Sequence, residues 1–263
     1  MGSPLEDHAA RLRKRPGEVA LCLDFDGTVA PIVDDPEAAR PLPGVVELLA
    51  RLAARYAAVA LVSGRPAGYL AQHAAAHGVM YLGLYGLQEV RDGLEWVDPR
   101  LEAAEAAVVA AFQDLRDDPA VRASGAHLED KRYAVAVHLR RVADPGRWAA
   151  SIAAAAMEVA DRRGLEVGPG RLVWELRPAV RGDKGDAVRK VVAESGARSV
   201  VVAGDDLGDL PAFAAVTELV AESYDGLRVA VRSAEAPPAL LASADLVVDG
   251  PAGLLEFLEL LAA

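Results

Sequence analysis

The sequence contains little cysteine, no excess of positive charge and no long apolar run. A single cysteine, Cys22, among 263 residues excludes a disulfide framework within the chain. The formal net charge of −11 argues against a general nucleic-acid surface or an acidic-membrane anchor. Because no stretch approaches the roughly 18 uninterrupted apolar residues of a membrane-spanning helix, we expect a cytoplasmic protein with no nucleic-acid or membrane partner and, by default, a monomer.

Apolar, strand-like stretches alternate along the chain with amphipathic, helix-like stretches, and hydrophobic residues make up 52% of the sequence. This alternation predicts an α/β fold in which helices cover a parallel sheet. From about residue 100 the order changes to helix, hairpin, helix, hairpin, which predicts an inserted α+β module. We therefore expect a core formed by residues 1–99 and 179–263, interrupted by an insert at residues 100–178.

Several local signals predict where individual elements begin and end. The main predicted strands of the core are residues 19–25, 57–64, 79–86 and 199–206. A further strand is expected at residues 217–223, and Gly78 is expected to end the helix that begins at Pro66. In the insert, Pro169 and Gly170 predict the turn of the second hairpin, because both residue types favour turns.

Polar clusters follow three of the predicted strands. They are Asp24 and Asp26 after the first strand, Ser63, Gly64 and Arg65 after the second, and Asp205, Asp206 and Asp209 after the strand near residue 200. Ligands bind an open parallel sheet beyond the carboxyl ends of its strands, so these groups are expected to meet at one edge. Carboxylates crowded there raise one another's pKa unless they share a cation. Mg²⁺ is the predicted ion, because it accepts a few carboxylates, keeps several waters and commonly meets a substrate phosphate.

A phosphate bound at this edge needs hydrogen-bond donors and a nucleophile. The candidate donors are the hydroxyl of Ser63, the amide of Gly64 and the ammonium of Lys184. Lys184 lies near a predicted helix amino terminus, where a positive charge is unfavourable, so a functional reason for it is favoured. An aspartate can attack phosphorus to form an aspartyl-phosphate that water later hydrolyses. Asp24 and Asp26 together can supply that nucleophile and the acid that protonates the leaving oxygen.

Taken in order, "DFDGT", "SGR", Lys184 and "GDDLGD" resemble the four motifs of the haloacid dehalogenase (HAD) superfamily of phosphatases. The insert is similar to that superfamily's type C2 cap, so the resemblance implies a HAD-like Rossmannoid core with a C2 cap. It implies that Asp24 is the nucleophile and a metal ligand, and that Asp26 is the general acid and base, with its backbone carbonyl on Mg²⁺. The remaining implied roles are Asp205 as a metal ligand, Asp206 or Asp209 as support for the metal or for Lys184, and Ser63 with Lys184 as the phosphoryl-binding pair.

A finer resemblance is to the trehalose-6-phosphate phosphatase family. The segment "LDFDGTVAPIVDDPEAA" is similar to that family's extended first motif, and "EDKRYAVAVHLR" and "GRLVWELRP" resemble its substrate-reading segments. The residues that the resemblance implies as substrate-binding are Glu129, Lys131, His138, Arg140, Glu175 and Arg177. The chain departs from the family pattern at Tyr85-Gly86, where a His-Gly pair is common, and at Gly208, where threonine is common.

The activity that the resemblance implies is Mg²⁺-dependent hydrolysis of a phosphorylated disaccharide, with trehalose 6-phosphate as the first candidate. Another phosphorylated disaccharide or pseudo-disaccharide, of the sucrose or mannosylglycerate type, would use the same core chemistry, and only the cap distinguishes these substrates. A phosphomutase would return the phosphoryl group to its substrate. A phospho-accepting regulatory domain also combines aspartates, a hydroxyl and a lysine, but it is short and lacks both a second acid like Asp26 and a large cap. A non-catalytic binding protein is disfavoured because every chemical position is filled.

Overall fold

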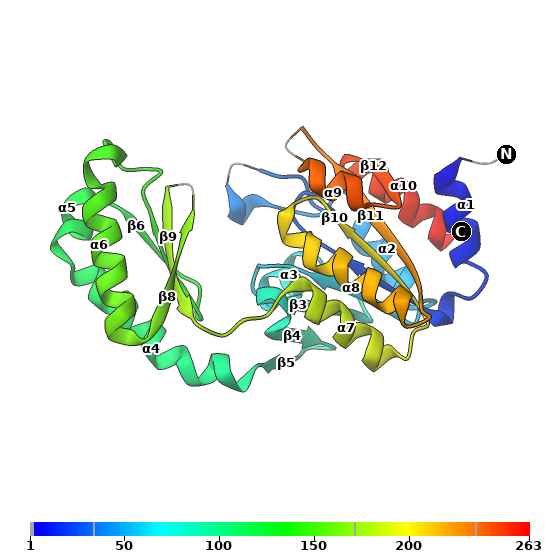
Figure 1. The fold of residues 1–263 in the computed structure, drawn as a ribbon, viewed down its shortest axis with the longest axis horizontal. Coiled ribbons are helices and arrows are strands. Elements are labelled where there is room, and N and C mark those ends of the chain that lie inside the picture. Colours follow the sequence, from blue (N-terminus) through cyan, green and yellow to red (C-terminus); the bar gives the residue numbers. More distant parts are fainter. Residues whose placement is uncertain (1–2, 34, 171, 235) are drawn as a thin grey trace. The chain divides into compact units, whose positions relative to one another are not determined.

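The structure, a computed structural model, describes residues 3–33, 35–170, 172–234 and 236–263. It divides into two compact units, one formed by Met1–Trp96 with Gly182–Ala263 and the other by Val97–Arg181 (Figure 1). Two distant stretches of the chain therefore build the first unit, and one continuous stretch builds the second. As boundaries of functional domains, residues 1–99, 100–178 and 179–263 stay predictions.

An eight-stranded sheet forms the centre of the first unit, in the order β12-β11-β10-β1-β2-β3-β4-β5. Its strands are β1 (Val19–Leu23), β2 (Ala58–Val62), β3 (Val79–Gly83), β4 (Gln88–Arg91), β5 (Leu94–Val97), β10 (Ser199–Gly204), β11 (Asp225–Arg232) and β12 (Leu246–Asp249). The strands from β12 to β3 run parallel, and β4 turns back antiparallel to β3. The predicted α/β fold with a parallel sheet is confirmed.

Helices cover both faces of this sheet (Figure 1). They are α1 (Pro4–Leu12), α2 (Val45–Ala53), α3 (Ala67–His73), α7 (Lys184–Ser195), α8 (Leu210–Ala221), α9 (Pro238–Ser243) and α10 (Gly250–Ala262). Side chains of α1, α2, α3 and α10 pack on one face, and those of α7, α8 and α9 pack on the other. β1 contributes to both cores, because Leu21 and Leu23 face the first set of helices while Ala20 and Cys22 face the second.

The second unit is an antiparallel sheet packed against three helices. Its strands, in sheet order, are β6 (His127–Asp130), β7 (Val135–His138), β9 (Val173–Pro178) and β8 (Leu165–Gly170), and its helices are α4 (Pro99–Asp117), α5 (Pro119–Ser124) and α6 (Pro145–Arg163). Val135, Val137 and Leu176 point from the sheet into a core shared with the helices. Because side chains alternate along a strand, His138 and Glu175 lie on the opposite face of the sheet. The predicted α+β character of the insert is confirmed.

One predicted strand, residues 217–223, is largely helical in the structure, because α8 continues into it. Val216 and Leu219 are buried one helical turn apart on the side of α8 that faces the sheet. The Thr217 hydroxyl donates a hydrogen bond to the carbonyl oxygen of Phe213 (3.1 Å), one helical turn earlier. Burial at helical spacing therefore overrides the strand-forming residue types of this short segment.

Two other predicted element ends are wrong. Helix α3 ends at His73 rather than at Gly78, whose positive φ (+76°) instead belongs to the loop before β3. Strand β8 continues through Pro169 and Gly170, which both pair with β9, so these residues belong to the strand and not to the turn. Residue 171, which follows them, lies outside the described residues.

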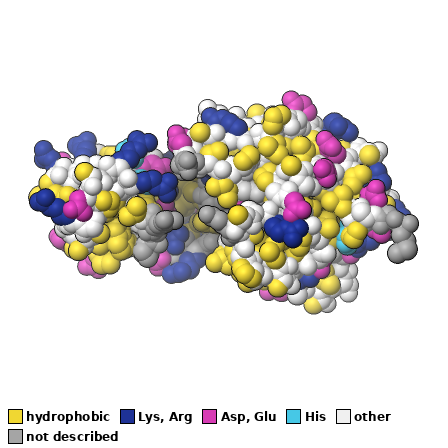
Figure 2. Space-filling view, turned by 90° about the horizontal axis from the view of Figure 1, so that it is seen from above, with side chains coloured by type: hydrophobic (Ala, Val, Ile, Leu, Met, Phe, Trp, Pro, Cys, Tyr) yellow, Lys and Arg dark blue, Asp and Glu magenta, His cyan; other side chains and the backbone are white. Residues whose placement is uncertain are grey.

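Acidic and basic side chains are interspersed with apolar ones over both units on the face shown in Figure 2. Among the residues that the structure describes, no helix combines the length and the apolar character needed to cross a membrane. Cys22 is buried, as its position inside an apolar stretch predicts.

Candidate active site

Neighbouring strands of the parallel sheet bring their polar carboxyl ends to one edge. Leu23 of β1 pairs with Ala203 of β10 on one side and with Leu61 of β2 on the other. The polar residues that emerge beyond these strand ends are Asp24, Ser63 and Asp205. β3 is the next strand in the sheet, so the turn that follows Gly83 lies at the same edge.

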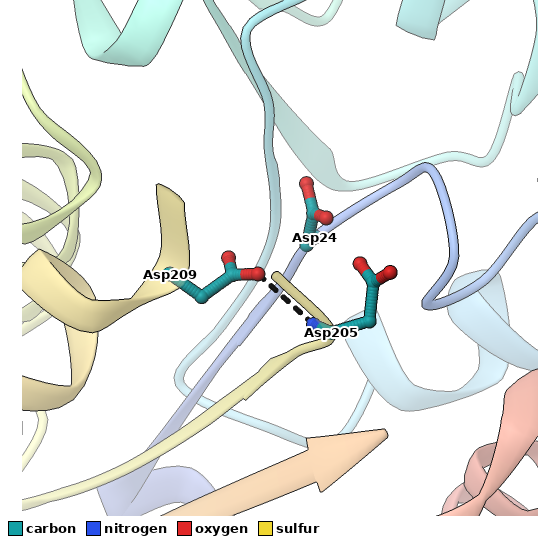
Figure 3. Close-up of side chains that lie close together, drawn as sticks. All are labelled: Asp24, Asp205 and Asp209. Carbon is teal, nitrogen blue, oxygen red and sulfur yellow. Dashed lines mark hydrogen bonds between the residues drawn. The ribbon is translucent and has the colours of Figure 1, made fainter. Parts of the chain in front are cut away.

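The carboxylates of Asp24, Asp205 and Asp209 form a buried cluster at this edge (Figure 3). One oxygen from each lies within 4.8 Å of the others, and the three residues are 6%, 5% and 1% exposed. The buried hydroxyl of Thr28 donates to Oδ1 of Asp205 (3.4 Å). The Thr28 side chain is not among the residues predicted for this site, although it belongs to the "DFDGT" motif.

Lys184 binds two of these carboxylates. It is the first residue of α7, and its Nζ lies 2.7 Å from Oδ1 of Asp24 and 2.7 Å from Oδ1 of Asp209. Its side chain is only 6% exposed, so both ion pairs are almost free of water. Removing one partner of a buried ion pair leaves a charge without compensation, so each partner depends strongly on the other. The ammonium therefore fixes the Asp24 carboxylate relative to the loop that follows β10.

Both oxygens of Asp209 have partners within the protein. Oδ1 accepts a hydrogen bond from Lys184, and Oδ2 accepts from the backbone N–H groups of Asp205 (2.9 Å) and Asp206 (3.1 Å). A Cβ atom at Gly204 would lie 2.1 Å from Cγ of Asp209, so the close approach requires glycine. Through these hydrogen bonds, Asp209 holds Lys184 and the loop after β10 in place.

Asp206 lies outside the cluster, although the sequence predicts similar roles for it and for Asp209. It is exposed, and its Oδ1 accepts the backbone N–H of Gly208 (2.8 Å), which caps the short helical turn Leu207–Asp209. Asp24 and Asp205 are therefore the clustered carboxylates with oxygens left to bind a cation.

Burial sets the charge balance of the cluster. Loss of water raises the pKa of Asp24 well above its usual value, although Lys184 opposes this effect. Burial, followed by the neighbouring charge of Asp209, raises the pKa of Asp205 to about 6. Burial alone would lower the pKa of Lys184, but the two carboxylates that it binds outweigh this effect and raise it. The three carboxylates of the cluster carry more negative charge than the single ammonium of Lys184 balances. Their hard oxygen atoms form a donor set that fits Mg²⁺.

The carboxylate of Asp26 binds Arg65 rather than joining the cluster. Arg65 donates from Nε to Oδ2 of Asp26 (2.6 Å) and from Nη2 to Oδ1 (2.8 Å), a bidentate pair. The same guanidinium lies 4.3 Å from the centre of the Tyr69 ring and 5.7 Å from that of Phe25. This role of Arg65 was not predicted. The sequence feature that pointed to it is the position of Arg65 as the last residue of the "SGR" motif.

The turn formed by Ser63 and Gly64 is closely packed. Ser63 is 3% exposed, and its Oγ accepts the backbone N–H of Arg65 (3.3 Å), which leaves its own hydroxyl hydrogen to be donated. Tyr85 lies against the next residue, since a Cβ atom at Gly64 would be 2.8 Å from the Tyr85 hydroxyl oxygen. A side chain at position 64 would therefore have to displace this ring.

Four of the six predicted substrate-binding residues form one polar network in the second unit. Nε2 of His138 lies 2.7 Å from Oε2 of Glu129, and Nζ of Lys131 lies 2.7 Å from Oε2 of Glu175 and 3.9 Å from Oε2 of Glu129. Their side chains are 30% to 35% exposed, so they are accessible to a ligand. The remaining two residues are exposed and lie outside this network: Arg140 and Arg177.

A parallel sheet with acidic carboxyl ends, interrupted by an α+β unit, is the architecture of the HAD-like hydrolases. The structure is similar to a haloacid dehalogenase-like hydrolase from Bacteroides thetaiotaomicron, with a TM-score of 0.58 at 17% identity over 91% of this chain and 98% of that one. It is also similar to the C-terminal domain of trehalose-6-phosphate phosphatase from C. albicans, with a TM-score of 0.69 at 24% identity over 98% and 96%. These likenesses confirm the predicted HAD-like core with a cap.

The sequence profile described as trehalose-phosphatase matches residues 22–243. The chain therefore belongs to the trehalose-phosphatase family. The trehalose-phosphate phosphatase of Mycolicibacterium paratuberculosis is 37% identical over 255 residues, which cover 92% of this chain and 62% of that protein. That of Mycobacterium leprae is 34% identical over 253 residues, covering 92% and 57%. The chain thus spans about three-fifths of the length of these relatives.

Proposed function

We propose that this chain hydrolyses trehalose 6-phosphate to trehalose and inorganic phosphate through a phosphorylated Asp24. The observation that carries the proposal is the buried cluster of Asp24, Asp205, Asp209 and Lys184 at the carboxyl edge of the sheet. Membership of the trehalose-phosphatase family supports both the reaction and the substrate. Relatives named trehalose-phosphate phosphatase support them further.

Asp24 is suited to attack phosphorus because its carboxylate is held in place before a substrate arrives. Lys184 binds one of its oxygens and favours the ionised form, which is the nucleophile. In the proposed first step, an Asp24 oxygen forms a bond to phosphorus while the bond between phosphorus and the sugar oxygen breaks. The charge on the phosphoryl oxygens needs positioned donors, and Lys184, Ser63 and the Gly64 amide are suited to this task.

Asp26 is the proposed general acid and base. It gives a proton to the departing sugar oxygen, and its carboxylate then takes a proton from the water that attacks phosphorus on Asp24 and releases inorganic phosphate. Arg65 binds both oxygens of Asp26. A protonated oxygen cannot accept from a guanidinium N–H as well as a carboxylate does, so we infer that Asp26 loosens at least one of these bonds during the reaction.

Mg²⁺ is the proposed cofactor. We propose Asp24, Asp205 and the backbone carbonyl of Asp26 as its ligands, since both oxygens of Asp209 have other partners. The raised pKa values of Asp24 and Asp205 support a cation at this position, because buried carboxylates that have lost water stay ionised only when positive charge compensates for the loss. When bound, Mg²⁺ neutralises charge on phosphoryl oxygens.

The second unit is proposed to bind the sugar and to discriminate among sugars. Its polar network offers both hydrogen-bond donors and acceptors, and a disaccharide presents many hydroxyl groups that such side chains bind. Lys131 and His138 hold the carboxylates of the network in place. The proposed sugar-binding residues are Glu129, Lys131, His138, Arg140, Glu175 and Arg177.

The test is phosphate release by the purified chain from a panel of sugar phosphates in the presence of Mg²⁺. We expect trehalose 6-phosphate to be the best substrate, and we expect Asp24→Asn or a chelator to abolish activity. Asp161→Asn, the same chemical change at an exposed position of α6, is the control and should keep full activity. If another sugar phosphate exceeds trehalose 6-phosphate a hundredfold in kcat/KM, about 2.7 kcal/mol of transition-state preference, the substrate assignment is wrong and the phosphatase chemistry stands.

A further inference from the structure

The turn Leu84–Gly86 after β3 has an unusual backbone. Leu84 and Tyr85 have φ angles of +50° and +60°, and Gly86 follows at +90°. Residues with a side chain adopt this left-handed conformation only at a cost in free energy, so the surrounding structure must hold it. Such positions cluster at sites that bind ligands.

The segment that carries Ser63 holds one side of this turn. The backbone N–H of Leu84 donates to the carbonyl oxygen of Arg65 (2.9 Å), and that of Tyr85 donates to the carbonyl oxygen of Ser63 (3.0 Å). The turn is therefore fixed to the residues on both sides of Gly64.

The beginning of α7 holds the other side. A Cβ atom at Gly86 would lie 3.0 Å from Cβ of Ala187, in the first turn of the helix that starts with Lys184. A Cβ atom at Gly182 would lie 3.1 Å from the carbonyl oxygen of Tyr85. The turn is thus packed between the proposed phosphate-binding residues and the helix that presents the catalytic ammonium.

This backbone brings the Tyr85 ring against Gly64. A Cβ atom at Gly64 would lie 2.8 Å from the hydroxyl oxygen and 2.9 Å from Cζ of the ring, so the phenol occupies the space of a side chain there. Tyr85 is 40% exposed, and within the described part of the chain its hydroxyl has no hydrogen-bond partner. The left-handed backbone of Leu84 and Tyr85 thus places the Tyr85 hydroxyl, a donor without a partner among the described residues, at the edge of the proposed phosphate site.

We propose that the Tyr85 hydroxyl donates a hydrogen bond to the phosphoryl group bound at Ser63 and Gly64. This inference rests on the proposed phosphatase function and adds one contact to it. Lys184 already supplies positive charge, so a neutral donor stabilises the phosphoryl group without a second buried cation. An aromatic side chain with two side-chain torsions on a fixed turn also loses little conformational freedom on binding.

Tyr85→Phe removes the hydroxyl and keeps the ring against Gly64. We expect kcat/KM to fall by about tenfold or more, the usual effect of one hydrogen bond to a charged group, for both trehalose 6-phosphate and p-nitrophenyl phosphate. The affinity for tungstate, a tetrahedral oxyanion like phosphate, should fall by a similar factor in calorimetry with Mg²⁺. Tyr224→Phe is the matched control, because Tyr224 precedes β11 at the opposite, amino-terminal end of the sheet, and it should change none of these values.

Equal losses on both substrates and on tungstate binding support the proposal. A loss confined to trehalose 6-phosphate would overturn it, because the hydroxyl would then contact the sugar, and unchanged kinetics and affinity would overturn it as well. Failure of the proposed substrate is a separate outcome, in which the wild type hydrolyses p-nitrophenyl phosphate but not trehalose 6-phosphate. Tungstate binding and p-nitrophenyl phosphate hydrolysis would still decide the role of Tyr85 in that case.

Discussion

Replacing Lys184 by methionine would remove the ammonium group and keep a side chain of similar length in the same buried space. In the wild type, Nζ lies 2.7 Å from both Asp24 and Asp209 in a side chain that is 6% exposed. Lys184→Met leaves these two carboxyl groups without their cation. Because burial already raises the pKa of both, we expect the variant to bind a proton there, and a protonated Asp24 is a poor nucleophile.

Loss of the Lys184 ammonium should lower both the Tm and kcat. Removing one partner of a buried ion pair costs about 3–5 kcal/mol, and proton uptake offsets part of this cost, so we expect a loss near the lower figure. At about 2–4 °C per kcal/mol for a unit of this size, the Tm should fall by roughly 6–12 °C. Loss of one positioned donor to the phosphoryl oxygens lowers kcat by about 10²–10³, and protonation of Asp24 lowers it further.

Phosphate release and thermal unfolding, measured on the same preparations, test this reasoning. Lys190→Met is the control, because Lys190 lies on the same helix and pairs with Glu89 (2.6 Å) in a side chain that is 28% exposed, so it should keep full kcat. Lys184→Arg keeps the charge but replaces a compact ammonium, whose single nitrogen lies 2.7 Å from both carboxylates, by a planar guanidinium that cannot reproduce this geometry, so we expect low activity. A kcat of Lys184→Met within fivefold of the wild type would refute the reasoning.

Four further predictions follow from particular contacts. Arg65→Met should lower kcat tenfold or more on trehalose 6-phosphate and by less on p-nitrophenyl phosphate. The leaving group of p-nitrophenyl phosphate needs no proton from Asp26, although the later attack of water still uses Asp26 as base, so equal losses would contradict this. Mg²⁺ should raise the Tm in thermal unfolding, and a Tm indifferent to Mg²⁺ would argue against the metal site. Glu175→Gln should lower kcat/KM about tenfold for trehalose 6-phosphate and spare p-nitrophenyl phosphate, whereas a loss on both would exclude a role confined to the sugar. Hydrogen bonds from Arg228 lower the pKa of Asp245, so that stabilisation is fully present above the unfolded pKa of about 3.9 and is lost as the pH falls through the lower folded pKa. Asp245→Asn should therefore lower the Tm slightly at pH 7 and by less at pH 3, and the same difference at both would contradict the linkage.

Much of the fold could be predicted because its signals are local. Helix α6 begins at Pro145, after an Asp144 side chain that accepts the N–H of Arg147, and it ends at Arg163, directly before Gly164, which has a left-handed backbone. Each of these signals lies within the helix or directly beside it. The segment 217–223 gave no such signal, because a short apolar run fits a strand or a helix, and burial against the sheet decides between them.

The site was predictable where backbone topology alone determines it. Asp24, Asp205 and Lys184 each lie at the end of a strand or the start of a helix, so the order of strands brings them together. The ion pair between Asp26 and Arg65 could not be predicted, because it depends on the direction of two side chains from different loops. A left-handed backbone at a residue other than glycine is likewise not visible in the sequence.

The two departures from the family pattern have different physical consequences. Gly208 donates its N–H to Asp206, which is exposed and outside the carboxylate cluster, so the absence of a threonine side chain there leaves the Asp24 cluster unchanged. Tyr85 instead lies against Gly64, at the edge of the proposed phosphate site. If the hydroxyl binds the phosphoryl group, replacing Tyr85 by the histidine that the family resemblance implies should change the affinity for tungstate or inorganic phosphate. The replacement should not change the choice among sugars, because the residues proposed to read the sugar lie in the second unit.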